Sequence, residues 1–205
     1  MRIWRQLGYD NSIPDRLFKQ FKKDNDHEEW CKKTLEYFKK ENLCSEQLNL
    51  ISEEIDLIPG FADAIHELEK RHINLFIVSG SIHNIIRYVL RDYLHLFTGI
   101  VANSFTFDEN GIIDKIIPTK YDFEGKREYI NKISRILGIS TNQFLFIGDS
   151  HNDEHVLDSG ARTICINPKG TNYSNEEHWS DYILNCNSLT EIIPYIDSCF
   201  NKDSD

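Results

Sequence analysis

An apolar run that ends in a glycine and an acidic loop is the feature of this sequence that most constrains its fold. The run covers Phe144 to Ile147, and Gly148, Asp149 and Asp153 follow it. Short apolar runs of this kind are typical of buried strands in a parallel sheet, whose carboxyl ends face the ligand crevice. The sequence therefore predicts a strand that delivers two carboxylates, with the Asn152 amide between them, into one pocket.

The side chains of this acidic loop suit a hard cation. Mg²⁺ in proteins is usually bound through one or two carboxylates together with oxygens of a substrate phosphate. We expect Asp149 to be a metal ligand, Asp153 to be a second ligand or to hold the water of the metal, and Asn152 to donate to a phosphate oxygen. The alternative is a turn that caps the next helix, because Asp and Ser are good N-cap residues.

Two further segments have the residue types of a phosphate pocket. The apolar run Phe76 to Val78 leads into Ser79 and Gly80, whose hydroxyl and backbone amide suit phosphate oxygens. Lys126 follows Gly125 just before a helical pattern and would neutralise phosphate charge as a point cation. Phosphoryl transfer depends mainly on positioning and charge neutralisation, so these are the groups that it needs. Taken singly, Ser79 and Gly80 also fit an ordinary strand-to-helix turn, and Lys126 also fits an exposed lysine.

In this order the segments resemble motifs two, three and four of the haloacid dehalogenase superfamily, in its phosphoserine-phosphatase-like branch. The resemblance covers roughly Ile58 to Gly170, and its most specific part is Gly-Asp-Ser-His-Asn-Asp at 148–153. It implies a three-layer, doubly wound parallel α/β sheet, a Mg²⁺ cofactor, and hydrolysis of a small phosphomonoester through an aspartyl-phosphate intermediate. The resemblance assigns catalysis to Lys126, Asp149 and Asp153, phosphate binding to Ser79, Gly80, Lys126 and Asn152, and the metal to Asp149 and Asp153.

One part of the family pattern has no counterpart in these 205 residues. The family begins with an apolar strand ending in Asp-x-Asp-x-Thr, whose first Asp is the nucleophile and a metal ligand and whose second is the general acid. Asp10 comes nearest, but Arg2, Arg5 and Gln6 interrupt the residues before it, so no buried strand delivers its carboxylate. Covalent phosphoaspartate chemistry needs that carboxylate. We therefore expect the chain as given to be inactive, and the alternative function is a non-catalytic binding or interaction module.

The missing strand would lie in the middle of the family's sheet, between the strands predicted at 75–78 and 144–147. Three explanations are open: an N-terminal truncation, a mis-set start, or a rearranged relative in which those two strands pair directly. Truncation is favoured because the helical lobe starts abruptly at Met1. If the strands on either side of the gap have unpaired edges, we expect the chain to have low stability or to self-associate, since exposed strand edges template pairing with another chain.

The residues before 57 predict a small helical lobe without a strand. Apolar residues recur there at helical spacing between Lys and Glu. In the resembled family a helical cap occupies this place and closes over the pocket. Trp4 and Trp30 are either substrate contacts or core residues, and aromatic residues at helical spacing are usually core. The predicted organisation is a cap-like lobe at 1–56, an α/β core at 57–200 and a disordered tail at 201–205.

Within the core, strands and helices alternate, as in βαβ units with a parallel sheet. A turn cluster between two β-rich runs predicts a hairpin, and Gly138 fits the C-terminus of a helix. Ser188 and Glu191 form a capping box that opens the last helix, which Pro194 should weaken. The predicted strands are 75–78, 100–102, 144–147, 163–166 and 182–184, the hairpin is 105–117, and the helices begin near 61, 82, 126, 151 and 188.

Composition argues against nucleic acid as a partner, and the resemblance implies a small-molecule phosphate substrate. The 33 acidic and 23 basic side chains give a net charge of −10, which would repel nucleic acid, and the pairs Lys32-Lys33 and Lys39-Lys40 are typical of solvated helix faces. Five cysteines, odd in number and unclustered, indicate neither a disulfide framework nor a zinc site. No apolar run approaches the roughly 18 residues that a membrane span needs. A reducing cytoplasm is the expected location.

Overall fold

The computed structural model describes residues 2–24, 26–121, 125–149, 151–167, 179–183 and 185–200, and the predicted tail at 201–205 lies outside them. By its internal packing the chain forms two compact units. We call Met1–Asp56 with Ser79–Lys120 the first unit, and Leu57–Val78 with Tyr121–Asp205 the second unit. Residues 79–120, predicted as part of the core at 57–200, group with the N-terminal helices, and the division into a cap-like lobe and a core stays a prediction.

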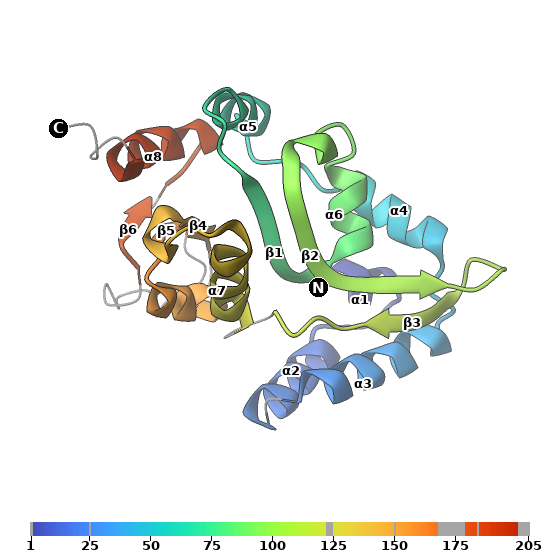
Figure 1. Ribbon diagram of the computed structural model, residues 1–205. Coiled ribbons are helices and arrows are strands. Elements are labelled where there is room, and N and C mark those ends of the chain that lie inside the picture. The colour runs from blue at the N-terminus through green and yellow to red at the C-terminus, as the bar shows by residue number, and fades with distance from the viewer. Residues whose placement is uncertain are drawn as a thin grey trace. The chain divides into compact units, whose positions relative to one another are not determined.

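The described residues before Leu57 form helices and no strand, as the sequence predicts (Figure 1). The helices are α1 (Arg2–Gln6), α2 (Ser12–Asp24), α3 (His27–Lys40) and α4 (Ser45–Glu53). Their apolar stripes bury Leu17, Phe21, Phe38, Leu48 and Ile51 in one cluster with residues of two strands that follow. The predicted helical lobe is therefore stabilised by a shared core, because single helices of this length are marginal in water.

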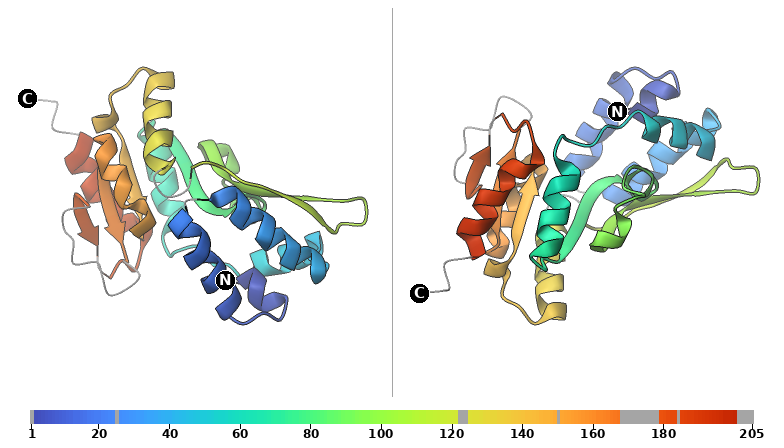
Figure 2. Two further views of the ribbon diagram at one scale, coloured as in Figure 1. Left: turned by 90° about the horizontal axis from the view of Figure 1, so that it is seen from below. Right: turned by 90° about the horizontal axis from the view of Figure 1, so that it is seen from above.

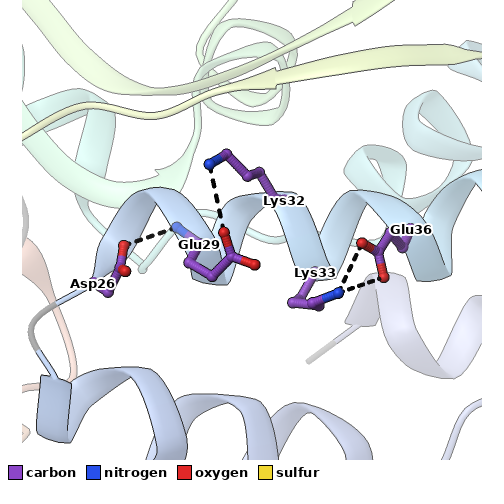
Figure 3. A network of polar contacts seen from close by, with 5 residues as sticks. All are labelled: Asp26, Glu29, Lys32, Lys33 and Glu36. Carbon is purple, nitrogen blue, oxygen red and sulfur yellow. Dashed lines mark hydrogen bonds and ion pairs between the residues drawn. The ribbon is translucent and has the colours of Figure 1, made fainter.

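The outer face of α3 carries the paired charges that the sequence predicts for a solvated helix. Asp26 caps the helix by accepting a hydrogen bond from the Glu29 amide at 3.0 Å (Figure 3). Lys32 pairs with Glu29 at 3.4 Å and Lys33 with Glu36 at 2.9 Å, and both lysine side chains are exposed. Exposed pairs of this spacing add only about 0.3–0.5 kcal/mol each. These lysines therefore belong to a solvent-exposed face of α3.

A three-stranded sheet has the order β1-β2-β3, and the division between the units falls within β1, whose residues up to Val78 belong to the second unit. Its elements are β1 (Leu75–Ile82), α6 (His83–Val89), η1 (Leu94–Leu96), β2 (Phe97–Phe107) and β3 (Ile113–Ile117). The predicted hairpin is confirmed, since β2 and β3 pair antiparallel with Ser104 opposite Ile117. Its turn is built by Asp108, whose carboxylate accepts from the Asn110 and Ile112 amides at 2.9 Å.

The strand at 75–78 was predicted too short. Extended backbone continues through Ser79 and Gly80 to Ile82, and α6 begins at the next residue. A side-chain amide of β2 holds the Gly80 carbonyl, which keeps this polar segment extended. Likewise the predicted runs 100–102 and 105–107 are parts of one strand, β2.

In the second unit a parallel sheet of order β4-β5-β6 lies between helices. The elements are α5 (Phe61–Lys70), α7 (Gly125–Leu137), η2 (Thr141–Gln143), β4 (Leu145–Gly148), η3 (His151–Ser159), β5 (Arg162–Ile166), β6 (Asp181–Ile183), η5 (Leu189–Ile192) and α8 (Ile193–Phe200). Leu145 and Ile147 pack with the α5 and α8 side, whereas Phe144 and Phe146 pack with α7 and η3. Figure 2 shows α8 running along this sheet. Apolar side chains on both faces confirm the predicted three-layer α/β arrangement.

Two local predictions need correction. The segment after Asp149 is a 3-10 helix, η3, where an α-helix was expected, although it ends at Ser159 as predicted. At the C-terminal end the capping box of Ser188 opens only the short η5, and α8 begins at Ile193. Pro194 thus sits in the first turn of α8, where its missing amide donor costs nothing.

The strands that flank the predicted gap are not paired with each other. Among the described strands β1 is the outer strand of one sheet and β4 is the outer strand of the other. Direct pairing of β1 with β4, the rearranged alternative, is therefore wrong for the structure described. Within the described ranges no helix is both long and apolar enough to cross a membrane.

Candidate functional site

A buried ion pair lies at the centre of the candidate site in the second unit. Lys126, in the first turn of α7, donates from Nζ to Oδ1 of Asp153 in η3 at 2.5 Å. The two side chains are only 6% and 5% exposed. Charged side chains are almost never buried this deeply unless they are paired. The reading of Lys126 as an ordinary surface lysine is therefore wrong.

The second oxygen of Asp153 fixes the turn that follows β4. The Asp149 amide donates to Asp153 Oδ2 at 3.3 Å. Both carboxylate oxygens of Asp153 thus contact protein groups, one a cation and one a backbone amide. Such charge-assisted contacts tie α7, η3 and the end of β4 together.

Gly148 is required by the packing around Asp153. A Cβ at this position would lie 2.6 Å from Asp153 Oδ2 and 2.8 Å from Trp179 Cη2. Both distances are far inside van der Waals contact, so only glycine fits here. Trp179 is 4% exposed and was missed by the sequence analysis, because no local pattern indicates which residue returns to cover a strand end.

Asp149 and Asn152 are the predicted metal and phosphate contacts next to Asp153. Asp149 directly follows β4 and is partly buried, and Asn152 lies in η3, where its side chain is outside the described part of the structure. Among the described residues no three His, Cys, Asp or Glu side chains gather as a metal cluster. The carboxylates that this strand end offers to a hard cation are those of Asp149 and Asp153.

The predicted phosphate-binding residues of β1 belong to the first unit. Ser79 Oγ accepts a hydrogen bond from the Ser81 amide at 3.1 Å, a local turn typical of Ser. Asn103 of β2, only 1% exposed, donates from Nδ2 to the Gly80 carbonyl at 2.9 Å and accepts from the Thr119 amide at 2.7 Å. Asn103 was also missed, although an amide within an apolar strand run was a usable signal.

The backbone before Asp10 excludes it as the missing nucleophile within the described residues. The residues Arg2–Gln6 form α1 and no strand. Asp10 is exposed and accepts a hydrogen bond from the Ser12 amide at 2.7 Å. Hydrogen bonding to Ser12 lowers the pKa of Asp10. Its carboxylate therefore closes a local turn just before α2.

Comparison with known families agrees with these motifs. The sequence profile of the haloacid dehalogenase-like hydrolases matches residues 11–156. The chain belongs to this family. A phosphoserine phosphatase of Mycobacterium tuberculosis is 23% identical over 119 residues, which are 58% of this chain and 29% of that protein. The chain thus spans less than a third of the length of this curated relative.

Solved structures show the same fold. A haloacid dehalogenase family hydrolase from Salmonella enterica serovar Typhi has a TM-score of 0.77 at 17% identity, covering 96% of this chain and 65% of the other. A phosphoserine phosphatase solved as an analogue of its phospho-aspartyl intermediate has a TM-score of 0.75 at 21% identity, covering 95% and 90%. At these identities the likeness establishes the phosphoserine-phosphatase-like fold and leaves the substrate open.

Proposed function

We propose that this chain carries the phosphate-binding part of a Mg²⁺-dependent phosphomonoesterase that acts on a small phosphorylated metabolite. The observation that carries the proposal is the buried pair of Lys126 and Asp153 beside the Asp149 loop. A lysine held in one place by a carboxylate is a preorganised positive charge, and phosphoryl transfer is catalysed mainly by such positioned charges. Hydrolases of this family and the phospho-aspartyl analogue of a similar structure support an aspartyl-phosphate route.

The residues at the end of β4 suit a hard cation that is bound through one carboxylate of the protein. Both oxygens of Asp153 already contact Lys126 and the Asp149 amide. We assign the metal to Asp149, which directly follows β4, and the orientation of the loop and the lysine to Asp153. When bound, Mg²⁺ would neutralise charge on the phosphate oxygens. Titration calorimetry should show weak Mg²⁺ binding that Asp149→Ala removes, and equal binding by both proteins would refute the site.

Residues 1–205 alone should not turn over a phosphomonoester. Among the described residues before Leu57 no strand delivers the carboxylate that covalent phosphoaspartate chemistry needs, and Asp10 is exposed in a local turn before α2. An assay with 4-nitrophenyl phosphate and Mg²⁺ should give no rate above background. Turnover that is lost in Asp10→Asn would show that Asp10 is the nucleophile after all.

The alternative is a non-catalytic module that binds a phosphorylated ligand without hydrolysing it. The same preorganised lysine favours it, and the absent nucleophile motif distinguishes it from an enzyme. The DNA immediately upstream of the Met1 codon separates the two. An in-frame apolar strand followed by Asp-x-Asp favours the enzyme, and a stop codon favours the module. For either, the five free thiols suit a reducing cytoplasm.

The outer strands β1 and β4 also support self-association as a proposal. Each has one edge without a strand neighbour among the described strands. Apolar side chains along them, including Phe76, Ile77 and Phe146, are only partly buried. Such edges pair readily with other chains. Light scattering over a concentration series should show growth in mass, and a monodisperse monomer at every concentration would contradict this.

A further inference from the structure

Asn103 of β2 is a buried amide beside the predicted phosphate-binding segment of β1, its neighbour in the sheet (Figure 1). The residue is only 1% exposed, and both ends of its side chain are bound. Nδ2 donates to the Gly80 carbonyl at 2.9 Å, and Oδ1 accepts from the Thr119 amide at 2.7 Å. His27 Nε2 lies 3.3 Å from the same oxygen. Asn103 therefore meets the requirement that buried polar groups be hydrogen-bonded.

The partners of Asn103 allow its amide only one orientation. A backbone amide can only donate and a backbone carbonyl can only accept. The oxygen must therefore face Thr119, and the nitrogen must face Gly80. Because an amide oxygen cannot donate, the His27 ring is the donor in its contact with Oδ1. Contacts from α3 and from the residue that follows β3 thus keep Nδ2 directed at β1.

The Asn103 side chain holds one peptide unit of the β1 segment. The Gly80 carbonyl and the Ser81 N–H belong to this unit, which is planar. Its carbonyl accepts from Asn103 Nδ2, and its N–H donates to Ser79 Oγ at 3.1 Å. Glycine has more backbone freedom than any other residue, so an external contact at Gly80 restricts the segment strongly. The peptide unit is therefore held at both of its polar atoms.

This arrangement leaves the Ser79 hydroxyl as a hydrogen-bond donor. Its oxygen already accepts from the Ser81 amide, and a hydroxyl has one hydrogen of its own to donate. Among the residues that the structure describes, no acceptor for that hydrogen is found. The oxygens of a phosphate accept hydrogen bonds strongly, because they carry negative charge. The hydroxyl is therefore suited to donate to a phosphate oxygen.

We propose that Asn103 is a positioning residue for phosphate binding. By holding the peptide unit between Gly80 and Ser81, it keeps the Ser81 amide on Ser79 Oγ and so directs the Ser79 hydroxyl as a donor to the phosphate. Asn103 itself touches no ligand. The phosphate role rests on the proposed function. The restraint on the peptide unit does not, because it can be measured without phosphate.

The matched control is Asn84→Ala. Asn84 of α6 also binds two backbone groups, since Nδ2 donates to the Phe105 carbonyl at 3.1 Å and Oδ1 accepts from the Phe105 amide at 2.9 Å. Both Asn84→Ala and Asn103→Ala should lower the urea midpoint, because each leaves a backbone donor and a backbone acceptor without their partner. Only Asn103→Ala releases the Gly80 carbonyl.

Amide exchange measured by NMR tests the restraint in the absence of phosphate. The Ser81 amide should exchange about fivefold faster in Asn103→Ala than in the wild type, the change that corresponds to one hydrogen bond of about 1 kcal/mol. Asn84→Ala should leave the exchange rate of Ser81 unchanged. The comparison separates local opening at β1 from a general loss of stability.

A ³¹P NMR titration of inorganic phosphate with Mg²⁺ tests the phosphate role. Asn103→Ala and Ser79→Ala should each weaken phosphate binding about fivefold, again the worth of one hydrogen bond. Asn84→Ala should bind phosphate as the wild type does. In a Ser79→Ala background, Asn103→Ala should weaken binding no further, because the hydroxyl through which it acts is gone. A merely structural role would give the same loss in both backgrounds.

The possible failures are distinguishable. An unchanged exchange rate of the Ser81 amide in Asn103→Ala would overturn the restraint. Additive losses of phosphate affinity in Asn103→Ala and Ser79→Ala, or an equal loss in Asn84→Ala, would overturn the positioning role. Absence of phosphate binding by the wild type would overturn the proposed function and the phosphate role of Asn103 together, even where Ser81 exchange confirms the restraint.

Discussion

The most deeply buried charges of the second unit are paired, whereas several buried polar atoms of the first unit have no partner among the described residues. In the second unit Lys126 and Asp153 are almost fully buried, and they bind each other at 2.5 Å. In the first unit Thr34 and Trp30 have polar atoms that are buried beside a cavity and have no partner among the described residues. The polar atoms of the first pair are satisfied by each other, and those of Thr34 and Trp30 are not satisfied by any described residue.

The two arrangements have different energetic consequences. A buried ion pair fixes geometry, because removing either partner leaves a charge that water cannot reach. An unpaired buried hydroxyl or indole lowers stability by about 1–3 kcal/mol. The second unit is therefore suited to hold a charge in place, and the first unit carries a local cost in stability at Thr34 and Trp30.

The largest expected effect is from Asp153→Ala. The substitution leaves the Lys126 ammonium buried without its partner, and breaking a buried pair in this way destabilises a protein by about 3–5 kcal/mol. Urea denaturation followed by circular dichroism measures the loss. Asp158→Ala is the control, because Asp158 is 61% exposed in its 3.7 Å contact with Arg127 and should change stability by at most about 0.5 kcal/mol.

The double variant Lys126→Met with Asp153→Leu sharpens this result. Replacing both charges by apolar side chains of similar size is often neutral, so most of the lost stability should return. A double variant that is as unstable as Asp153→Ala would mean that packing around η3, and not the unpaired charge, sets the cost.

A smaller effect is expected from Gly148→Ala. The added methyl would press on Asp153 Oδ2 at 2.6 Å and on Trp179 at 2.8 Å, and overpacking of this kind costs about 1–3 kcal/mol. The cost should fall when Gly148→Ala is combined with Asp153→Ala, because one of the two clashes is gone. Strictly additive losses in urea denaturation would show that the two positions do not interact.

Sequence patterns predicted the elements of the second unit well, because the apolar spacing of neighbouring residues is enough to distinguish its strands from its helices. The run at 144–147 became β4, and Gly138 follows α7 with a positive φ of 68°. Lys126, Asp149 and Asp153 were singled out by motif, and the structure brings them to one strand end.

The remaining features depend on contacts that no local spacing encodes. Trp179 reaches Gly148 from a distant part of the chain, and Asn103 reaches Gly80 from a neighbouring strand. The grouping of 79–120 with the N-terminal helices also follows from packing, since Phe105 and Ile113 share a core with α2, α3 and α4. Periodicity predicts that such residues are buried, but not which partners bury them.

The smallest expected effect concerns His83, at the start of α6 in the first unit. Burial lowers the pKa of His83 below its ordinary value of 6.5, and the nearby Arg87 charge lowers it further. Because the folded-state pKa is depressed, the neutral ring favours folding above pH 6.5, and this small contribution is lost as the pH falls through the folded-state pKa. NMR titration should give a midpoint below 6.5 that Arg87→Gln raises only in part, since burial is the larger cause. A midpoint restored fully by Arg87→Gln would assign the shift to charge alone.

The most direct test of the account is a ³¹P NMR titration of inorganic phosphate in the presence of Mg²⁺. It compares the wild type with the double variant Lys126→Met, Asp153→Leu, which should stay folded, and with Lys132→Met, which removes an exposed lysine from the same helix. The account predicts that the wild type and Lys132→Met bind phosphate with similar affinity and that the double variant binds it at least about tenfold more weakly, the loss of one charge-assisted contact. Equal phosphate affinity of the folded double variant and the wild type would contradict the claim that the buried lysine is the phosphate-binding cation of this fold.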